Sequence, residues 1–440
     1  MGRTMRGMTT RFICGLLGAA VWQLLAAGTM AADFRLSARS GDALRQDAIV
    51  RKELPAKLLA DRFGQPAIDA IAVDSPACWS LVLEQHPELV RPVEVVKDGD
   101  NVRLTWVEPG SWQSGEERRW TLKPESPRDF RSPWSWKRTE DGQVELHHAA
   151  RGLVFRYRAE LENRPGLPIT QNRGAYIHPF LTPSGKTATG DFSPFHTHHR
   201  GFFLAYAKTT VGDHHPDFWN IHGGTAKIVA NKDSIRTVAG PVTARLTARH
   251  DWQLRDKARP EADTGASVGD ETWEISVYEV PGEPAWVWDI ASTQTPRGHD
   301  MVLVKHRYGG MAYRGPEPFV KGKLDVLTSE GADTRAKADQ KPARWIDLTG
   351  PVADGSSEYV GAVMCDHPAN PRFPNVVRIH PTLLPFFSFV PAHREDLRLE
   401  AGKPVTWRYR TMVHDGRPDG AWNEALFADF ATPVDVQLRD

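Results

Sequence analysis

The feature that most constrains the fold of this chain is a series of short segments in which β-branched and aromatic residues alternate with polar ones. Clusters of glycine, proline, aspartate and asparagine bound them, and the chain holds 36 glycines and 33 prolines. Such segments are typical of strands. The clearest are 101–108, 153–161, 272–280, 285–292 and 405–413. The pattern predicts an all-β dominated protein, a large antiparallel β-sandwich or a doubled sandwich.

Helical periodicity is weak. Only 55–63 and 421–430 space their apolar residues as a helix does. Length does not impose a domain boundary, because sandwiches often exceed the usual domain size. The segment RPGLP at 164–168 is the best candidate hinge. We therefore expect an N-terminal β region over 33–165 and the main sandwich over 166–440.

The first 32 residues have the order of a secretory signal peptide. Three arginines, Arg3, Arg6 and Arg11, precede an apolar run over 12–27, and small residues follow it. The run is too short for a retained span, so we expect cleavage and a periplasmic or secreted protein. No second apolar run approaches the ~20 residues of a membrane helix, so we expect no membrane span after cleavage.

Net charge and cysteine content limit which partners and which redox chemistry the sequence allows. The chain carries 55 basic and 55 acidic residues, and removal of the leader leaves it close to neutral. Without a basic excess, nucleic acid and anionic membranes lack an electrostatic basis as partners. Cys78 and Cys365 remain after cleavage, and the sequence fits either one disulfide or two free thiols.

The densest group of chemically active side chains is HTHHRGFF at 196–203. Six of the chain's 17 histidines lie between His178 and His215. On a strand, His196 and His198 would face one side and His199 the other. The glycine that follows Arg200 lets the chain turn away, and two phenylalanines then anchor it in the core.

Six motifs follow one another along 176–416. They are YIHPFLTPSG at 176–185, HTHHRGFF at 196–203, DFWN at 217–220, GGMAYRG at 309–315, HPANPRFP at 367–374 and RYRTMVHDG at 408–416. In this order they resemble a family of secreted bacterial proteins, the PmoA family, with Thr197 standing where proline is expected. The resemblance implies carbohydrate metabolism, because such proteins are common in bacteria that degrade glycans. We also expect a galactose-mutarotase-like sandwich.

The methane oxygenase label that this family carries fails a physical test. A particulate methane monooxygenase subunit is an integral membrane protein, and the chain has no second run that could form a helical span. The label would still hold in a narrower sense if the protein carried a soluble copper site, and the histidines permit such a site.

Three interpretations of the histidines stay open. In the first, His178, His196 and His198 bind a divalent metal ion such as zinc, calcium or copper. In the second, His198 or His199 acts as a general acid or base while Arg200 grips a carboxylate or a hydroxyl pair. In the third, the imidazoles only hydrogen-bond the loops at an edge of the sandwich.

Weaker groups supply further candidates. In VLVKHRYGG, Lys305 and Arg307 would share one strand face and His306 the other, although surface charge is the commoner explanation of such a pattern. Arg378 and His380 also share a face if extended, so His380 is a candidate for the same cleft. The catalytic candidates are His198, His199, Arg200 and His306, and the substrate-binding candidates are Trp219, Lys305, Arg307, Asn370, Arg372 and Arg378.

The 15 tryptophans suit both a core and a sugar-binding platform. Trp112, Trp134, Trp136 and Trp219 stand in polar or turn-rich segments, which favours a platform. Trp286 and Trp288 are expected in the core.

We expect an exported carbohydrate-active enzyme, a hydrolase or lyase on a sugar or oxidised sugar, that uses the histidines and arginine. A two-carboxylate glycosidase fits less well, because the conspicuous grouping is not acidic. The alternatives are a copper-dependent oxidase and a non-catalytic glycan-binding protein. The sequence leaves the sugar, the linkage and the oligomeric state open.

Overall fold

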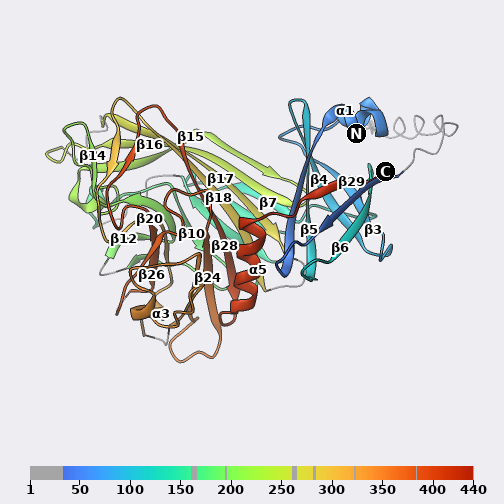
Figure 1. Ribbon diagram of the computed structural model, residues 1–440. Coiled ribbons are helices and arrows are strands. Elements are labelled where there is room, and N and C mark those ends of the chain that lie inside the picture. Colours follow the sequence, from blue (N-terminus) through green and yellow to red (C-terminus); the bar gives the residue numbers. More distant parts are fainter. Residues whose placement is uncertain are drawn as a thin grey trace, which may run out of the picture. The chain divides into compact units, whose positions relative to one another are not determined.

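The protein is a β protein in which several antiparallel sheets pack on one another (Figure 1). The computed structural model describes residues 33–159, 166–193, 196–259, 265–280, 284–321, 324–382 and 384–439. Strands make up 52% of the chain and helices 10%, well below the usual helical third, so the expected fold class is confirmed. The expected leader at 1–32 lies outside the described residues.

A seven-stranded sheet is built mostly from the N-terminal part of the chain. Its order is β2 (Arg45–Pro55), β5 (Asn101–Trp112), β4 (Val90–Asp98), β3 (Ala77–Leu83), β6 (Glu117–Lys123), β1 (Phe34–Arg39) and β29 (Val436–Arg439). The last strand comes from the opposite end of the chain, and Figure 1 shows it among the blue N-terminal strands. Three tryptophans, Trp106, Trp112 and Trp120, pack edge to face in the core of this sheet.

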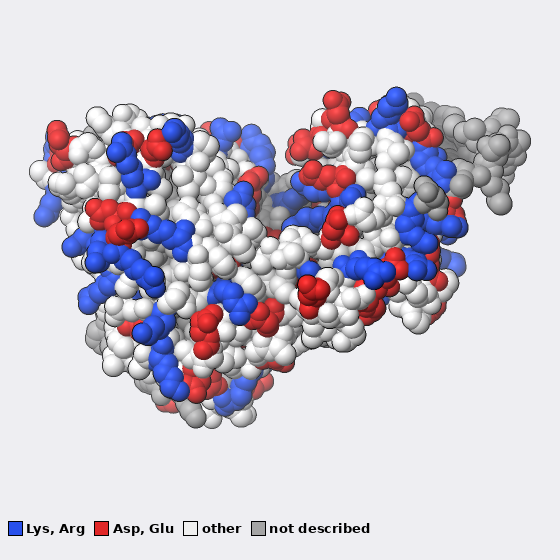
Figure 2. Space-filling model, viewed as in Figure 1, with Lys and Arg blue, Asp and Glu red and all other residues white. Residues whose placement is uncertain are grey.

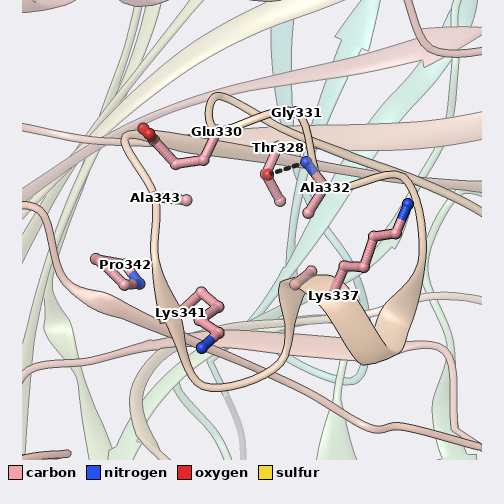
Figure 3. A pocket seen from close by; sticks show the side chains of 9 residues that line it. Thr328, Glu330, Gly331, Ala332, Lys337, Lys341, Pro342 and Ala343 are labelled. Atoms are coloured by element: carbon pink, nitrogen blue, oxygen red, sulfur yellow. Dashed lines mark hydrogen bonds between the residues drawn. The ribbon is translucent and has the colours of Figure 1, made fainter.

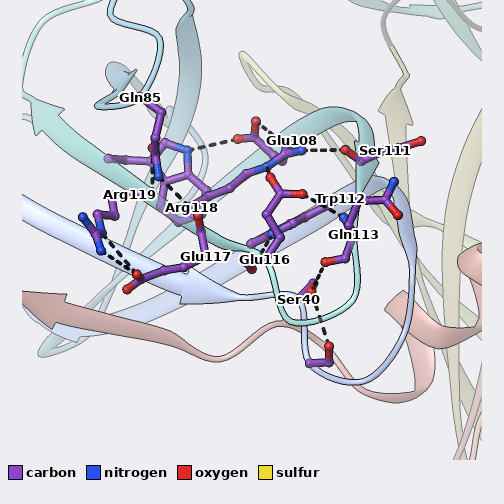
Figure 4. Close-up of polar contacts among 12 residues, drawn as sticks. Ser40, Gln85, Glu108, Ser111, Trp112, Gln113, Glu116, Glu117, Arg118 and Arg119 are labelled. Carbon is purple, nitrogen blue, oxygen red and sulfur yellow. Dashed lines mark hydrogen bonds and ion pairs between the residues drawn. The ribbon is translucent and has the colours of Figure 1, made fainter.

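Polar groups in the seven-stranded sheet are paired with one another (Figure 4). Buried Glu108 accepts hydrogen bonds from Nη1 of Arg118 at 2.9 Å and from Nε1 of Trp120 at 3.0 Å. Burial raises the pKa of Glu108, against the opposing effect of Arg118. Glu116 accepts from Nε of the same arginine at 3.1 Å. These contacts hold strands and turns together, and we assign no chemistry to them.

Two larger sheets form the main sandwich. The nine-stranded sheet has the order β22 (Lys341–Pro342), β25 (Val376–Ile379), β26 (Phe386–Val390), β20 (Gly309–Arg314), β13 (Phe202–Tyr206), β10 (Tyr176–Phe180), β9 (Gly152–Arg158), β8 (Val144–His148) and β7 (Trp134–Arg138). The eight-stranded sheet has the order β15 (Ala226–Ala239), β16 (Thr243–Leu254), β17 (Ser267–Glu279), β18 (Ala285–Pro296), β28 (Val405–Asp415), β24 (Tyr359–Asp366), β23 (Trp345–Pro351) and β21 (Asp325–Thr328). The five segments expected as strands lie in β5, β9, β17, β18 and β28, which confirms those predictions.

The small sheets and helices lie around this sandwich. The sheets pair β11 (Asp191–Ser193) with β12 (His196–Arg200), and β14 (Thr209–Val211) with β19 (Met301–Leu303) and β27 (Leu397–Leu399). The helices are α1 (Ala56–Phe63), α2 (Gln65–Asp69), α3 (Pro318–Lys321), α4 (Arg335–Ala338) and α5 (Gly420–Ala431), with 3₁₀ turns η1 (Ile169–Gln171) and η2 (Ile221–Gly223). Helices α1 and α5 confirm the two expected helices. Among the described residues, no helix has the length and apolar character to cross a membrane.

The nine-stranded sheet uses residues from both sides of position 165. Strands β7, β8 and β9 precede that position, yet β9 pairs with β10, which follows it. The hinge expected at 164–168 lies partly outside the described residues. Most of the tryptophans considered as platforms are core: Trp112 and Trp134 are buried, as are Trp286 and Trp288.

The core of the sandwich contains one closed polar network. The Oη of Tyr157 lies 2.7 Å from Nε2 of His250, and Nδ1 of His250 lies 2.8 Å from Oε2 of Glu271. Glu271 also accepts from Trp252 and Ser292. Because the carboxylate is surrounded by donors, it can stay ionised inside the protein.

Both cysteines of the described chain are free thiols. Cys365 is buried on β24 and Cys78 is half-buried on β3. Burial raises the pKa of Cys78 to about 11, so this thiol is not activated as a nucleophile. The disulfide considered from the sequence is therefore not formed.

Candidate functional site

The strand register divides the side chains of the nine-stranded sheet between two faces. Ile177, Phe202, Tyr313 and Phe387 lie opposite one another on successive strands, and the ring of Phe202 contacts Trp288 of the other sheet at 5.0 Å. Directly opposed residues share a face and neighbours along a strand alternate. The other face therefore carries Tyr176, Phe203, Arg314, Phe386 and Ser388. We call these five residues the site face.

The hairpin of β11 and β12 brings histidines onto the site face. The ring of His199 lies 4.6 Å from the ring of Phe386 and 6.2 Å from that of Phe203. The ring of His198 lies 4.6 Å from that of His199, and the ring of His196 lies 5.2 Å from it. The rings of His196, His198 and His199 therefore lie together.

The expected alternation along this strand does not separate His199 from its neighbours. The strand pairing of β11 and β12 shifts register between Asp191 and Ser193. Such an irregularity bends the strand and redirects side chains. The regular two-residue period that placed His199 on the opposite side is therefore a poor guide in this short hairpin.

Two further histidines complete the group from other parts of the chain. The ring of His222, in the turn η2, lies 5.2 Å from that of His198. The ring of His380, just after β25, lies 6.3 Å from that of His196. His380 was considered for the same cleft from its sequence position, whereas His222 was missed, and its only sequence signal is its place just after the DFWN motif. We call His196, His198, His199, His222 and His380 the histidine cluster.

The electrostatic setting lowers the pKa values of His196, His198, His199 and His380, which keeps these four imidazoles neutral. Burial, and after it the charges of His222, His196 and nearby arginines, together lower the pKa of His198 to about 3. Burial, then His198 and Arg314, lower the pKa of His199 far below its ordinary value. Burial and the positive charge of Arg378 bring the pKa of His380 to about 4. Uncharged imidazole can accept a proton or a hydrogen bond.

Several buried polar atoms in this region have no hydrogen-bond partner among the described residues. They include Nδ1 of His196, Nδ1 of His199, Oγ of Ser388, and Nε and Nη1 of Arg314. Arg314 is the last residue of β20 and is fully buried. Sequence analysis passed over this arginine, although it belongs to the GGMAYRG motif. Buried polar groups in folded proteins are nearly always paired, so a concentration of unpaired ones requires an explanation.

Arg200 is occupied by the protein itself. Its Nη2 donates to the carbonyl of Gln171 at 2.7 Å and its Nη1 to Oδ1 of Asp191 at 3.3 Å. The guanidinium also stacks on the ring of Phe192, 3.2 Å from its centre. These contacts make Arg200 a structural clamp for the β11–β12 hairpin, and the ligand-gripping role expected for it has no support in this geometry.

The three histidines expected as metal ligands do not form one group. Nδ1 of His178 lies 2.9 Å from Oγ1 of Thr189, whereas the rings of His196 and His198 lie 5.5 Å apart over the site face. Among the described residues, no three histidine, cysteine, aspartate or glutamate side chains are arranged to hold a metal ion. A bound metal stays a prediction, and we derive no step through it.

Most of the expected substrate-binding residues lie away from the cluster or are engaged in the scaffold. Asn370 is buried and donates to Asp366 and to the carbonyl of Arg408. The guanidinium of Arg372 donates to three carbonyls in the loop 391–396. Arg378 forms a close ion pair with Asp339.

The remaining two basic candidates are exposed. Lys305 and Arg307 flank His306 in the segment between β19 and β20. Burial, then Lys208, lower the pKa of His306 to about 4. His306 contacts Tyr308 at 4.3 Å between ring centres.

Trp219 cannot offer its ring faces to a sugar, because it is 1% exposed. The rings of His199, Phe203, Tyr308 and Phe386 surround it at 4.8–5.7 Å. Its expected role as a platform is therefore wrong. Trp219 instead supports His199 from behind and links the cluster to Tyr308, and through it to His306.

Cavities elsewhere in the protein fit a ligand site less well. One of about 370 Å³ is formed by the loops around Thr328 and Lys341, and Figure 3 shows Thr328 accepting from the backbone of Ala332 within it. Another of about 520 Å³ lies between the seven- and eight-stranded sheets, where Glu94 is already bound by Thr243. Figure 2 shows positive and negative side chains interspersed over the face in view, without a continuous basic stripe. Neither cavity gathers neutral histidines beside an unpaired arginine.

Comparisons with known proteins give a family without an assigned activity. The model of a family of unknown function, DUF6807, matches residues 143–428, more than half of the chain. No curated protein matches the chain. Among solved structures, the chain is similar to an alpha-mannosidase from Enterococcus faecalis V583, with 9% identity and a TM-score of 0.39 over 92% of this chain and 46% of that chain. None of these matches names the PmoA family, so that resemblance stays a prediction.

Proposed function

We propose that this chain, which belongs to the DUF6807 family, is an exported carbohydrate-active enzyme, a hydrolase or lyase whose reacting centre is the histidine cluster. The observation that carries the proposal is the convergence, on one face of the sheet, of neutral imidazoles and a guanidinium, that of Arg314, whose Nε and Nη1 have no acceptor among the described residues. Perturbed titratable groups that share one concentrated site are typical of catalytic centres.

The saccharide part of the proposal is supported by the sequence. The histidine cluster lies within the motifs that resemble secreted proteins of glycan-degrading bacteria. The groups at the site are imidazole, hydroxyl and guanidinium, which exchange hydrogen bonds with hydroxyl-rich ligands. The half-buried ring of Tyr308, which packs on Trp219 beside the cluster, supplies apolar surface for the C–H face of a sugar ring.

The chemistry of both reaction types requires proton transfer between fixed groups. In hydrolysis, a base takes a proton from water while an acid protonates the leaving oxygen of the glycosidic bond. In β-elimination, a base takes a proton from carbon and the leaving oxygen again receives one, so a carbon–carbon double bond forms. A neutral imidazole serves as the base in either case. His198 is our candidate, because it lies between His199, His196 and the exposed His222.

The geometry also assigns supporting roles. Trp219 and Phe386 hold the ring of His199, and the Arg200 clamp fixes the hairpin that carries the cluster. A catalytic group must be held to within fractions of an ångström, and packing of this kind provides that rigidity. Export completes the proposal and follows from the leader, and N-terminal sequencing of the mature protein tests it.

The test is a degradation assay on mature protein purified without a histidine tag. We would incubate it with neutral and acidic polysaccharides and analyse the products by mass spectrometry. Hydrolysis adds one water for each bond broken, whereas elimination adds none and leaves an unsaturated sugar. Three variants accompany the wild type: His198→Ala, His199→Ala and the control His86→Ala, whose side chain is 62% exposed.

Degradation by the wild type and by His86→Ala, with loss in both cluster variants, is the expected result. Binding of a glycan without product from any polymer would instead make the protein a binding module. Degradation that survives both cluster variants would place the reacting centre elsewhere.

A further inference from the structure

The fully buried Arg314 is held by its backbone but only partly by its side chain. Its N–H donates to the carbonyl of Gly201 and its carbonyl accepts from the N–H of Gly190, which fixes the end of β20 against the neighbouring segments. Its Nη2 donates to Glu317 at 2.7 Å. Within the described chain, Nε and Nη1 have no acceptor.

The charge of Arg314 is therefore poorly compensated. Glu317 is 48% exposed, so water screens its interaction with the guanidinium. Burial lowers the pKa of Arg314, and the pairing with Glu317 opposes that effect incompletely. Burying a cation with open donors is unfavourable unless something binds them.

A second buried arginine provides the contrast. Arg200 is also fully buried, but its charge faces Asp191, whose side chain is 3% exposed, and a backbone carbonyl. The two arginines are thus buried to the same extent and differ in the partners of their guanidinium groups.

Apart from Glu317, the described neighbours that share the site face with Arg314 are an aromatic ring, a hydroxyl group and imidazoles. Phe386 lies directly across the strand pair and its ring contacts His199. Ser388 lies one pleat further along the same face, fully buried, with no partner for its hydroxyl among the described residues. Arg314 also acts electrostatically on both His196 and His199. A site with a guanidinium, a hydroxyl and imidazoles matches a ligand that brings negative charge.

We propose that the saccharide bound at the histidine cluster is acidic, and that its oxyanion accepts hydrogen bonds from Nε and Nη1 of Arg314. The oxyanion is a sugar carboxylate or a sulfate ester, since both offer several acceptor oxygens to a planar donor. This inference rests on the proposed function and makes Arg314 the residue that selects the substrate.

Binding measurements on the full mature protein test the inference. Calorimetry would compare methyl glucuronoside, methyl glucoside, glucose 6-sulfate and inorganic sulfate. The variants are Arg314→Met, which removes the charge at similar length, Arg314→Lys, which keeps the charge without the fork, and Arg297→Met, a control on an exposed arginine. Melting temperatures show whether each variant is folded.

The wild type and Arg297→Met should bind one acidic saccharide at least ~10-fold more tightly than the methyl glucoside, the effect of charge-assisted hydrogen bonds in a buried site. Arg314→Met should bind the acidic and neutral sugars equally, and Arg314→Lys should recover part of the preference. The glucuronoside and the sulfate ester distinguish the two oxyanions.

Three outcomes overturn the inference. Equal binding of neutral and acidic saccharides by the wild type, lost in His198→Ala, would leave the proposed function standing and remove the acidic substrate. A preference that survives in Arg314→Met would move the anion site elsewhere. Binding of inorganic sulfate with no affinity for any saccharide would mean an adventitious ion only and would contradict the proposed function as well.

Discussion

Two of the regions in which histidine is buried, those of His250 and His199, hold it in opposite ways. His250 lies between the sheets of the sandwich, where Glu271 and Tyr157 engage both of its ring nitrogens. His199 is also buried, but its Nδ1 has no partner among the described residues and Arg314 adds positive charge beside it. We call the surroundings of His250 the closed site, because both of its ring nitrogens have partners. We call the surroundings of His199 the open site, because its Nδ1 has none among the described residues.

The two environments differ because the hydrogen-bond partners of the imidazoles come from different kinds of structure. Glu271 stands directly opposite His250 on the neighbouring strand, so the sheet register itself provides the acceptor. The imidazoles of the histidine cluster come from a short hairpin, a 3₁₀ turn and the loop after β25, and the residue paired with His196 in the hairpin is Ser193 and not an acid. A satisfied buried network stabilises the fold, whereas an unsatisfied one is retained when a ligand completes it.

The largest expected effect is on activity at the open site. His198→Ala should lower turnover of the degraded polymer by at least ~100-fold, because a proton-transfer group is lost. The melting temperature should change little, since the side chain contributes to a site rather than to the core. His86→Ala serves as the control. Full activity in His198→Ala would mean that the histidine cluster has a structural role and not a catalytic one.

At the closed site the expected effect falls on stability. His250→Ala leaves the carboxylate of Glu271 buried without its main partner, and we expect it to lower the free energy of unfolding by ~3–5 kcal/mol. Urea unfolding measures this value. Folded molecules of the variant should keep their activity, and a variant as stable as the wild type would break the comparison.

Acid should weaken the closed site in a defined window. Burial acts to raise the pKa of Glu271, but hydrogen bonds and charge from His250, with bonds from Ser292 and Gln294, outweigh it and lower that pKa to about 2 from the ordinary 4.5. A depressed pKa stabilises the folded state above the ordinary value, and the contribution is lost as the pH falls from 4.5 toward 2. The unfolding free energy of Glu271→Gln should depend less on pH in that window than that of the wild type. Equal slopes would contradict the account.

The smallest effect is expected from metal removal. The rings of His196 and His198 lie together while His178 is bound to Thr189, so two imidazoles alone would hold a divalent ion weakly. Chelation of untagged protein should change activity less than ~10-fold, whereas loss of the cluster residues changes it ~100-fold. A stoichiometric ion that takes the activity with it on removal would restore the metal hypothesis.

The fold was accessible from the sequence because its strands are long and regular. Alternation over 272–280 and 285–292 corresponds to β17 and β18, and turn residues mark where those strands end. The sequence also predicted that His196 and His198 share a strand face, since they are two residues apart, but it placed His199 on the other face. His380 was predicted as a candidate for the same cleft, because it would share a strand face with Arg378.

Partners that come from distant segments could not be predicted. Arg200 and Arg314 both precede a glycine in aromatic-rich motifs, and nothing local distinguishes them. Arg200 is paired because the irregular β11–β12 register brings Asp191 to it. Trp219 looked exposed in its polar segment, yet aromatic rings from three other elements enclose it.

The most direct test of the comparison is the melting temperature of Arg200→Met beside that of Arg314→Met, measured without ligand. Both arginines are fully buried, so the change in side-chain volume is matched. Removal of Arg200 leaves Asp191 buried without its cation and should lower the melting temperature by several degrees. Removal of Arg314 takes away a poorly compensated charge and should leave the melting temperature unchanged or raise it. A loss in Arg314→Met as large as that in Arg200→Met would mean that the site is part of the scaffold and would contradict the account.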